Sequence, residues 1–152
     1  MTGTEDELAR QLRLLFIKIA PAIKTPQPKP MNDVSMYIAN NQPPAFIYYR
    51  KGLCEHQKLL AIVHELTHAC LTRPGSGGDE EEYERQEPCS NQAAAVICST
   101  YGISDYRKVM RSLTVPAYRF HGGDPTTIEL MIERVGTALE QPGVFPEWAN
   151  PI

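Results

Sequence analysis

The sequence lacks the features that mark membrane-spanning, secreted and nucleic-acid-binding proteins. Its apolar stretch 12–22 is interrupted by Arg13 and Lys18, and the first ten residues are acidic where a secretory signal is basic. The 152 residues carry a net charge of −3 and no cluster of lysine and arginine. We therefore expect a cytoplasmic protein that has neither a membrane nor a nucleic acid as its partner.

Cysteine is also scarce, and the four residues show no CxxC pair. Without a secretory signal, this pattern favours reduced, buried thiols over two disulfides. Two disulfides would instead fit a secreted or toxin-like protein, which is a further possibility. The four residues are Cys54, Cys70, Cys89 and Cys98.

The length suits a single domain that spans the whole chain. A Thr-x-x-Glu capping box at Thr4 and apolar residues at helical spacing predict an N-terminal helix over 5–20. Four prolines make 21–30 an extended connector, and the prolines and glycine of 141–152 predict an irregular tail.

The middle of the chain changes from strand-like to helical patterning. Two β-strands are predicted over 34–39 and 45–49, around a turn rich in asparagine and proline. A helix of about 18 residues should follow and end before Pro74, because its apolar residues recur every three or four positions. They are Leu59, Ile62, Val63, Leu66 and Cys70. The acidic segment 75–84 reads as a solvated loop.

Three further helices are predicted in the C-terminal half. The first covers 87–101 and closes at Gly102. Ser104 should cap a short helix over 105–113. The last helix begins at Asp124-Pro125 and has a core stripe. That stripe consists of Ile128, Met131, Ile132, Val135 and Leu139.

The chemistry of the sequence centres on an HExxH motif, His64-Glu65-Leu66-Thr67-His68, inside the predicted central helix. Residues four apart lie on one helix face, with Cβ atoms about 5–6 Å apart, so His64 and His68 can bind the same ion. Glu65 lies beside them and could take a proton from a water on that ion. The pattern predicts a single Zn²⁺ with Glu65 as general base.

A catalytic zinc needs a third protein ligand and an open position. The longer metzincin motif is absent, because Leu71 and Pro74 occupy its glycine and last histidine positions. Glu87 is the preferred third ligand, with Glu84 as the alternative among the acids of 80–87. Asn91 lies one turn after Glu87 and could hold the second ring nitrogen of a histidine.

His64-Glu65-Leu66-Thr67-His68, followed by Glu87-x-x-x-Asn91-x-Ala-Ala, resembles the gluzincin peptidases, in particular the small prokaryotic and phage ImmA/IrrE metallopeptidases. The resemblance covers 45–97, and Ala93-Ala94-Ala95 departs from the family's signature after the asparagine. It implies an α+β fold: a minimal zincin-like domain with a small antiparallel or mixed β-sheet packed on the HExxH helix, and additional helices. It also implies a protein substrate such as a repressor or another regulator.

Two residues near a glycine pair, Tyr118 and His121, are candidates for stabilising the oxyanion of the transition state. The leading hypothesis is a zinc-dependent peptidase that hydrolyses a peptide bond in a protein or peptide substrate. The alternative is a non-catalytic zinc-binding module that keeps the scaffold for binding or sensing, with Cys70, Cys89 or His121 closing the metal site.

Overall fold

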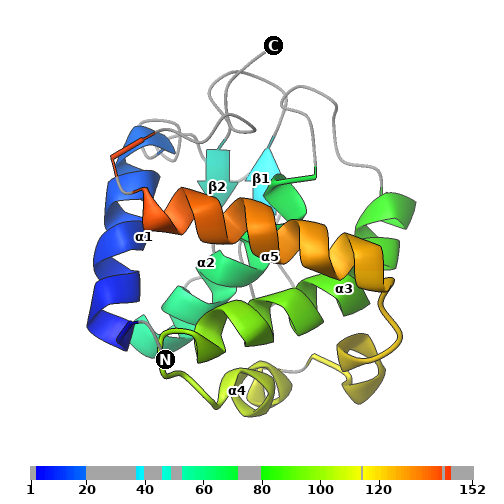
Figure 1. Cartoon of the computed structure of the whole chain (residues 1–152). Helices are drawn as coiled ribbons and strands as arrows, with labels where there is room; N and C mark the ends of the chain where they lie inside the picture. The colour runs from blue at the N-terminus through cyan, green and yellow to red at the C-terminus, as the bar shows by residue number, and fades with distance from the viewer. Residues whose placement is uncertain are drawn as a thin grey trace.

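Helices dominate the part of the chain that the structure, a computed structural model, describes: residues 3–19, 37–39, 46–48, 53–71, 80–113, 115–141 and 143–144. In Figure 1, α5 and α3 cross in front of α2, with α1 to one side. The α-helices are α1 (Glu5–Ile19), α2 (Glu55–Ala69), α3 (Glu80–Ser99), α4 (Tyr106–Ser112) and α5 (Pro125–Glu140). A short 3-10 helix, η2, spans Ala117–Phe120.

The predicted α+β class is wrong, because helices build the described fold. Within the strands expected over 34–39 and 45–49, the structure describes β1 (Tyr37–Ala39) and β2 (Phe46–Tyr48), of three residues each. They pair antiparallel, with Ile38 opposite Ile47. A two-stranded ribbon this short is too small to form a layer. Instead of a sheet, α3 and α5 pack against α2.

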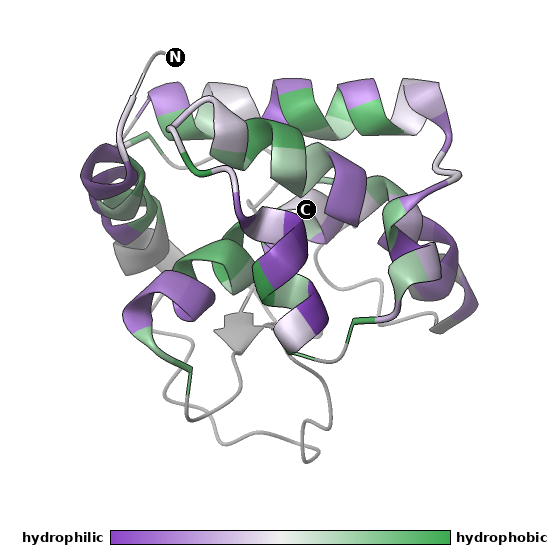
Figure 2. Ribbon diagram, turned by 90° about the horizontal axis from the view of Figure 1, so that it is seen from below, coloured by the Kyte–Doolittle hydropathy of each residue, from purple (hydrophilic) through white to green (hydrophobic). Residues whose placement is uncertain are grey.

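The two helices predicted with the clearest end signals are observed close to their expected limits. Glu7 N donates to Thr4 Oγ1 at 3.2 Å at the start of α1, and Thr127 N donates to Asp124 Oδ2 at 2.9 Å at the start of α5. These bonds satisfy amide groups that have no partner within the helix. Most of the predicted apolar faces are buried: Leu8, Leu12, Leu15, Met131, Val135 and Leu139, whereas Ile128 and Ile132 of the predicted stripe are only partly buried. Figure 2 shows polar and apolar residues alternating along the helices, as expected when one face of each is buried.

Helix α3 begins earlier than its sequence suggests. Part of the acidic segment expected to be a loop is helical, because α3 starts at Glu80 and runs through Pro88. Glu87 is therefore in the helix interior and not in the first turn. Acidic residues at a helix N-terminus interact favourably with the helix dipole. This interaction offsets part of the free energy lost with the backbone hydrogen bond that Pro88 cannot donate.

The expected cap of α4 also needs correction. Asp105, and not Ser104, is the N-cap of α4, and its side chain binds His56 rather than a helix amide. Gly123 lies close to the backbone of α3. A Cβ on Gly123 would lie 2.9 Å from Cys89 Cα, so this position needs glycine for its close approach to α3.

Other sequence predictions lie outside the described residues. These are the connector 21–30, the turn between the strands and most of the tail 141–152. Among the described helices, none combines the length and the apolar character that crossing a membrane requires. All four cysteines are free thiols, and Cys54 alone is exposed.

Candidate metal centre

The side chains of His64, His68 and Glu87 converge in the interior between α2 and α3. Glu87 Oε1 lies 2.8 Å from His64 Nε2 and 2.6 Å from His68 Nε2, and the two imidazole centroids are 5.1 Å apart. Each residue can offer one ligand atom within 4.8 Å of the other two. Two ligand atoms bound to one zinc at about 2.0–2.2 Å lie at most about 4.4 Å apart, and the distances from Glu87 Oε1 to the two nitrogens, 2.8 and 2.6 Å, are within that limit.

The helices bring these three residues together for simple geometric reasons. His64 and His68 are one turn apart on α2, and α3 packs along that helix. Ala93 and Ala94 on α3 are fully buried, and their small side chains allow close packing of the two helices. The sequence prediction that Glu87 faces the histidines agrees with this arrangement.

A chain of hydrogen bonds fixes the proton of the His64 ring. Asn91 Nδ2 donates to the carbonyl oxygen of Arg119 at 3.0 Å, which leaves Asn91 Oδ1 as an acceptor. The Tyr106 hydroxyl donates to that oxygen at 2.9 Å and lies 2.9 Å from His64 Nδ1. Since the hydroxyl proton is directed to Asn91, His64 Nδ1–H must donate to the hydroxyl oxygen.

The second histidine is oriented in the same way. His68 Nδ1 lies 2.9 Å from Gln86 Oε1, which can only accept a hydrogen bond. Both rings therefore carry a proton on Nδ1, and Nε2 is the nitrogen that faces Glu87 and could bind a metal. A metal-ligating histidine has this form when its other nitrogen donates to an outer partner.

The resulting donor set fits a divalent cation. His64 Nε2 and His68 Nε2 lie 2.8 and 2.6 Å from Glu87 Oε1, so a proton or a cation must lie between each nitrogen and that oxygen. Two nitrogens and one carboxylate oxygen are typical ligands of zinc. His64, His68 and Glu87 are all buried, so water screens the electrostatic interactions at the site poorly.

Burial and neighbouring charges set the protonation states. Burial acts to raise the pKa of Glu87, but the two imidazoles outweigh it and hold that pKa well below its usual range. Burial lowers the pKa of His68, despite the opposing effect of Glu87. An ionised carboxylate and a neutral imidazole are the forms that bind a metal.

Glu65 lies at the same site without belonging to the ligand set. Its side chain is 1% exposed, and its Oε1 is 3.9 Å from His64 Nε2. A carboxylate at that distance from a ligand atom is near enough to contact a water on the shared ion. This is the position that the HExxH spacing predicts for a general base.

Glu84, the alternative third ligand, has a different partner. Its side chain is 55% exposed, and both of its oxygens accept from Arg119 Nη2, at 3.1 and 2.9 Å. Arg119 Nη1 also donates to Glu87 Oε2 at 3.4 Å. The arginine thus holds the Glu87 oxygen that does not face the histidines, which favours Glu87 over Glu84 as the ligand.

The structure does not bring the remaining candidates into the ligand set. Tyr118 is 68% exposed and His121 is exposed, so their predicted role in stabilising an oxyanion stays a prediction. Cys70 Sγ donates to the Thr67 carbonyl oxygen at 3.1 Å. Among the described residues, the group that could hold a metal consists of His64, His68 and Glu87, without Cys89.

Sequence reasoning missed three of the residues that surround the ligands: Gln86, Tyr106 and Arg119. It also expected Asn91 to bind a histidine directly, whereas the Tyr106 hydroxyl lies between them. The signal for Gln86 was available, because it directly precedes the ligand. Tyr106 and Arg119 lie 15 and 28 positions from Asn91, and only the tertiary fold brings them near.

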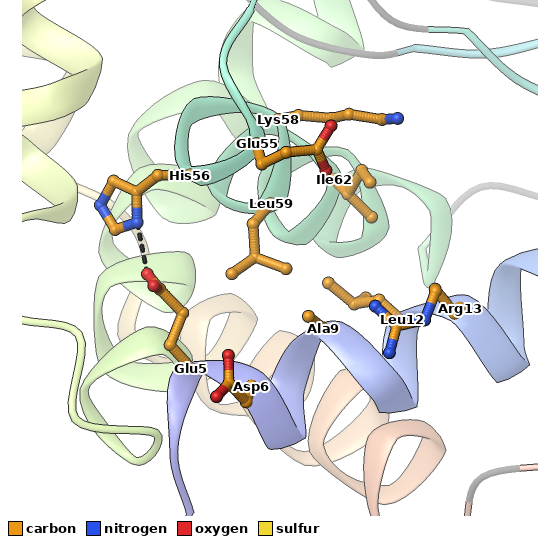
Figure 3. Close-up of a pocket in the computed structure, with 10 residues that line it drawn as sticks. All are labelled: Glu5, Asp6, Ala9, Leu12, Arg13, Glu55, His56, Lys58, Leu59 and Ile62. Carbon is orange, nitrogen blue, oxygen red and sulfur yellow. Dashed lines mark hydrogen bonds and ion pairs between the residues drawn. The ribbon is translucent and has the colours of Figure 1, made fainter.

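A separate hollow of about 350 Å³ lies between α1 and the start of α2 (Figure 3). Leu59 points from α2 across the hollow toward α1. His56 closes one end through bonds to Glu5 and to Asp105 Oδ2, the latter at 2.9 Å. The lining includes none of the three candidate ligands, so the hollow is not their substrate cleft.

No family model, curated protein or solved structure matches the chain.

Proposed function

We propose that the protein is a zinc-dependent peptidase that hydrolyses a peptide bond in a protein or peptide substrate, such as a regulator or repressor. The observation that supports this most strongly is the meeting of His64 Nε2, His68 Nε2 and Glu87 Oε1, with Glu65 beside them. His64, His68 and Glu87 would hold one zinc ion. When bound, zinc would supply Lewis acidity, which lowers the pKa of a water and polarises a carbonyl.

The chain's own residues have distinct tasks in this reaction. Glu65 would accept the proton of the attacking water and deliver it to the leaving amine. Arg119 would hold Glu87 Oε2, so that Oε1 stays directed at the histidines. With His64, His68 and Glu87 as ligands, a zinc ion would keep a fourth position for water or substrate, as in catalytic zinc sites.

One observation favours the second candidate, a zinc-binding module without catalysis. His64, Glu65, His68 and Glu87 are all buried, whereas a protein substrate must reach the metal. A buried zinc that only supports the fold or a binding surface would have this environment. We favour the peptidase because a purely structural site gives no reason for a buried acidic residue next to the ligands.

The proposal includes a location in the cytoplasm. The thiols of Cys70, Cys89 and Cys98 are free and buried, and a reducing compartment would keep them so. Burial raises the pKa of Cys70 and of Cys98 to about 12, which leaves both as inert thiols.

The deciding experiment compares zinc-loaded wild type with Glu65→Gln on a mixed peptide library, read by mass spectrometry. Wild type should cleave a subset of peptides, and the variant should keep one zinc but cleave at least about 100-fold more slowly, as expected for loss of a general base. Glu55→Gln, an exposed change on the same helix, is the matched control.

Two outcomes would count against the peptidase. Equal cleavage by wild type and Glu65→Gln would remove Glu65 from the mechanism. Full zinc occupancy with no cleavage of any library peptide, or of unfolded protein, would support the non-catalytic module.

A further inference from the structure

The hydroxyl of Tyr106 occupies an unusual place for a polar group in the core. The residue is 2% exposed, begins α4, and lies between Asn91 on α3 and His64 on α2. Its two hydrogen bonds are both 2.9 Å long, so the hydroxyl uses its proton on one side and a lone pair on the other. Phenylalanine could fill the same volume without these bonds.

The direction of these hydrogen bonds is set at Arg119, the residue farthest from His64 in the series. The backbone carbonyl of Arg119 can only accept, so it orients the Asn91 amide with Oδ1 toward Tyr106. That oxygen in turn takes the tyrosine proton, and the tyrosine oxygen is left to accept from His64. Each residue in this series can hydrogen-bond in one direction only. The Arg119 carbonyl in η2 therefore fixes, through α3 and α4, which nitrogen of the ring on α2 carries the proton.

We infer that Tyr106 is a positioning residue that holds the His64 proton on Nδ1 and so keeps Nε2 available to the metal. The inference rests on the proposed metal site and adds a residue that the HExxH motif does not contain. Tyr106 acts through His64, and its contribution should therefore be seen in metal affinity and in the protonation pattern of that ring.

The first test measures zinc affinity by competition with a chromophoric chelator, for wild type and Tyr106→Phe. Loss of an outer-shell partner typically weakens metal binding by about 10–100-fold, and we expect a loss in that range. Tyr101→Phe removes a hydroxyl from another buried tyrosine and should leave the affinity unchanged. Equal affinity of Tyr106→Phe and wild type would overturn the inference.

The second test needs no variant and remains decisive if Tyr106→Phe does not fold. In zinc-free wild type, ¹⁵N spectra of the histidine rings should show His64 protonated on Nδ1 and unprotonated on Nε2. A ring protonated on Nε2 alone would overturn the inference. If wild type shows the expected ring but binds no zinc, the proposed function fails and the role of Tyr106 in orienting the ring stands.

Discussion

Replacing Glu87 with glutamine should remove most of the stabilisation that zinc gives to the folded protein. Glu87 supplies the carboxylate of the ligand set, and its Oε1 lies within 2.8 Å of both Nε2 atoms. Glutamine keeps the size of the side chain but loses its charge. Loss of an outer-shell partner costs up to about 100-fold in metal affinity, so loss of a ligand should cost at least about as much.

The effect on thermal stability follows from linkage. With free zinc at about 100 times the dissociation constant, wild type gains about 2.7 kcal/mol, whereas a variant that binds about 100-fold more weakly gains about 0.4 kcal/mol. For a protein of this size, 1 kcal/mol shifts Tm by about 2–4 °C. Zinc should therefore raise Tm by about 5–10 °C in wild type and by about 1 °C in Glu87→Gln.

The assay is calorimetry of each protein with and without zinc, so that each variant provides its own baseline. Glu84→Gln is the matched control, because it makes the same change one turn earlier on α3, where the carboxylate is 55% exposed and bound to Arg119. It should keep the wild-type shift. A full zinc shift in Glu87→Gln, or its loss in Glu84→Gln, would refute the assignment of the third ligand.

Three further predictions concern the rest of the fold. Leu60 is 0% exposed, and Leu60→Ala should lower the free energy of unfolding by about 2–5 kcal/mol in urea titrations. Leu14→Ala, at a residue that is 39% exposed, should change it little. Comparable losses in the two variants would contradict the core assignment. The bonds from His56 to Asp105 and Glu5 outweigh burial and raise its pKa above 6.5, so its stabilising effect is present below about pH 6.5 and is lost as the pH rises through the folded value. His56→Gln should thus destabilise the protein at about pH 5.5 more than at about pH 8.5, and equal losses at both would argue against the ion pairs. A thiol reagent should modify Cys54 at once and the buried Cys70, Cys89 and Cys98 only on unfolding, whereas rapid modification of all four would contradict their burial.

More of the candidate site than of the fold could be predicted from the sequence. The four-residue spacing of His64 and His68 fixes their relation within one helix, and the choice of Glu87 needed only that a neighbouring helix pack closely. The helices with side-chain caps, α1 and α5, were also predictable, because capping is a local interaction.

The errors arose where tertiary context outweighs local preference. The helix predicted over 87–101 begins earlier, because α3 starts at Glu80, eight residues before Pro88. The aromatic and β-branched residues of β2 suggested a sheet, but strand propensity depends on partners that a three-residue ribbon does not provide. The resemblance to the ImmA/IrrE peptidases implied the same sheet, so it gave no independent check on the fold class.

The most direct test of the metal centre is X-ray absorption at the zinc edge on the purified, zinc-loaded protein, together with its metal content. We predict one zinc per chain, bound by nitrogen and oxygen atoms at about 2.0–2.2 Å, with two imidazoles among the ligands. One imidazole should be lost from the zinc shell in His64→Ala and the other in His68→Ala. A first shell that contains sulfur, or a metal-replete protein that retains no zinc, would contradict the account.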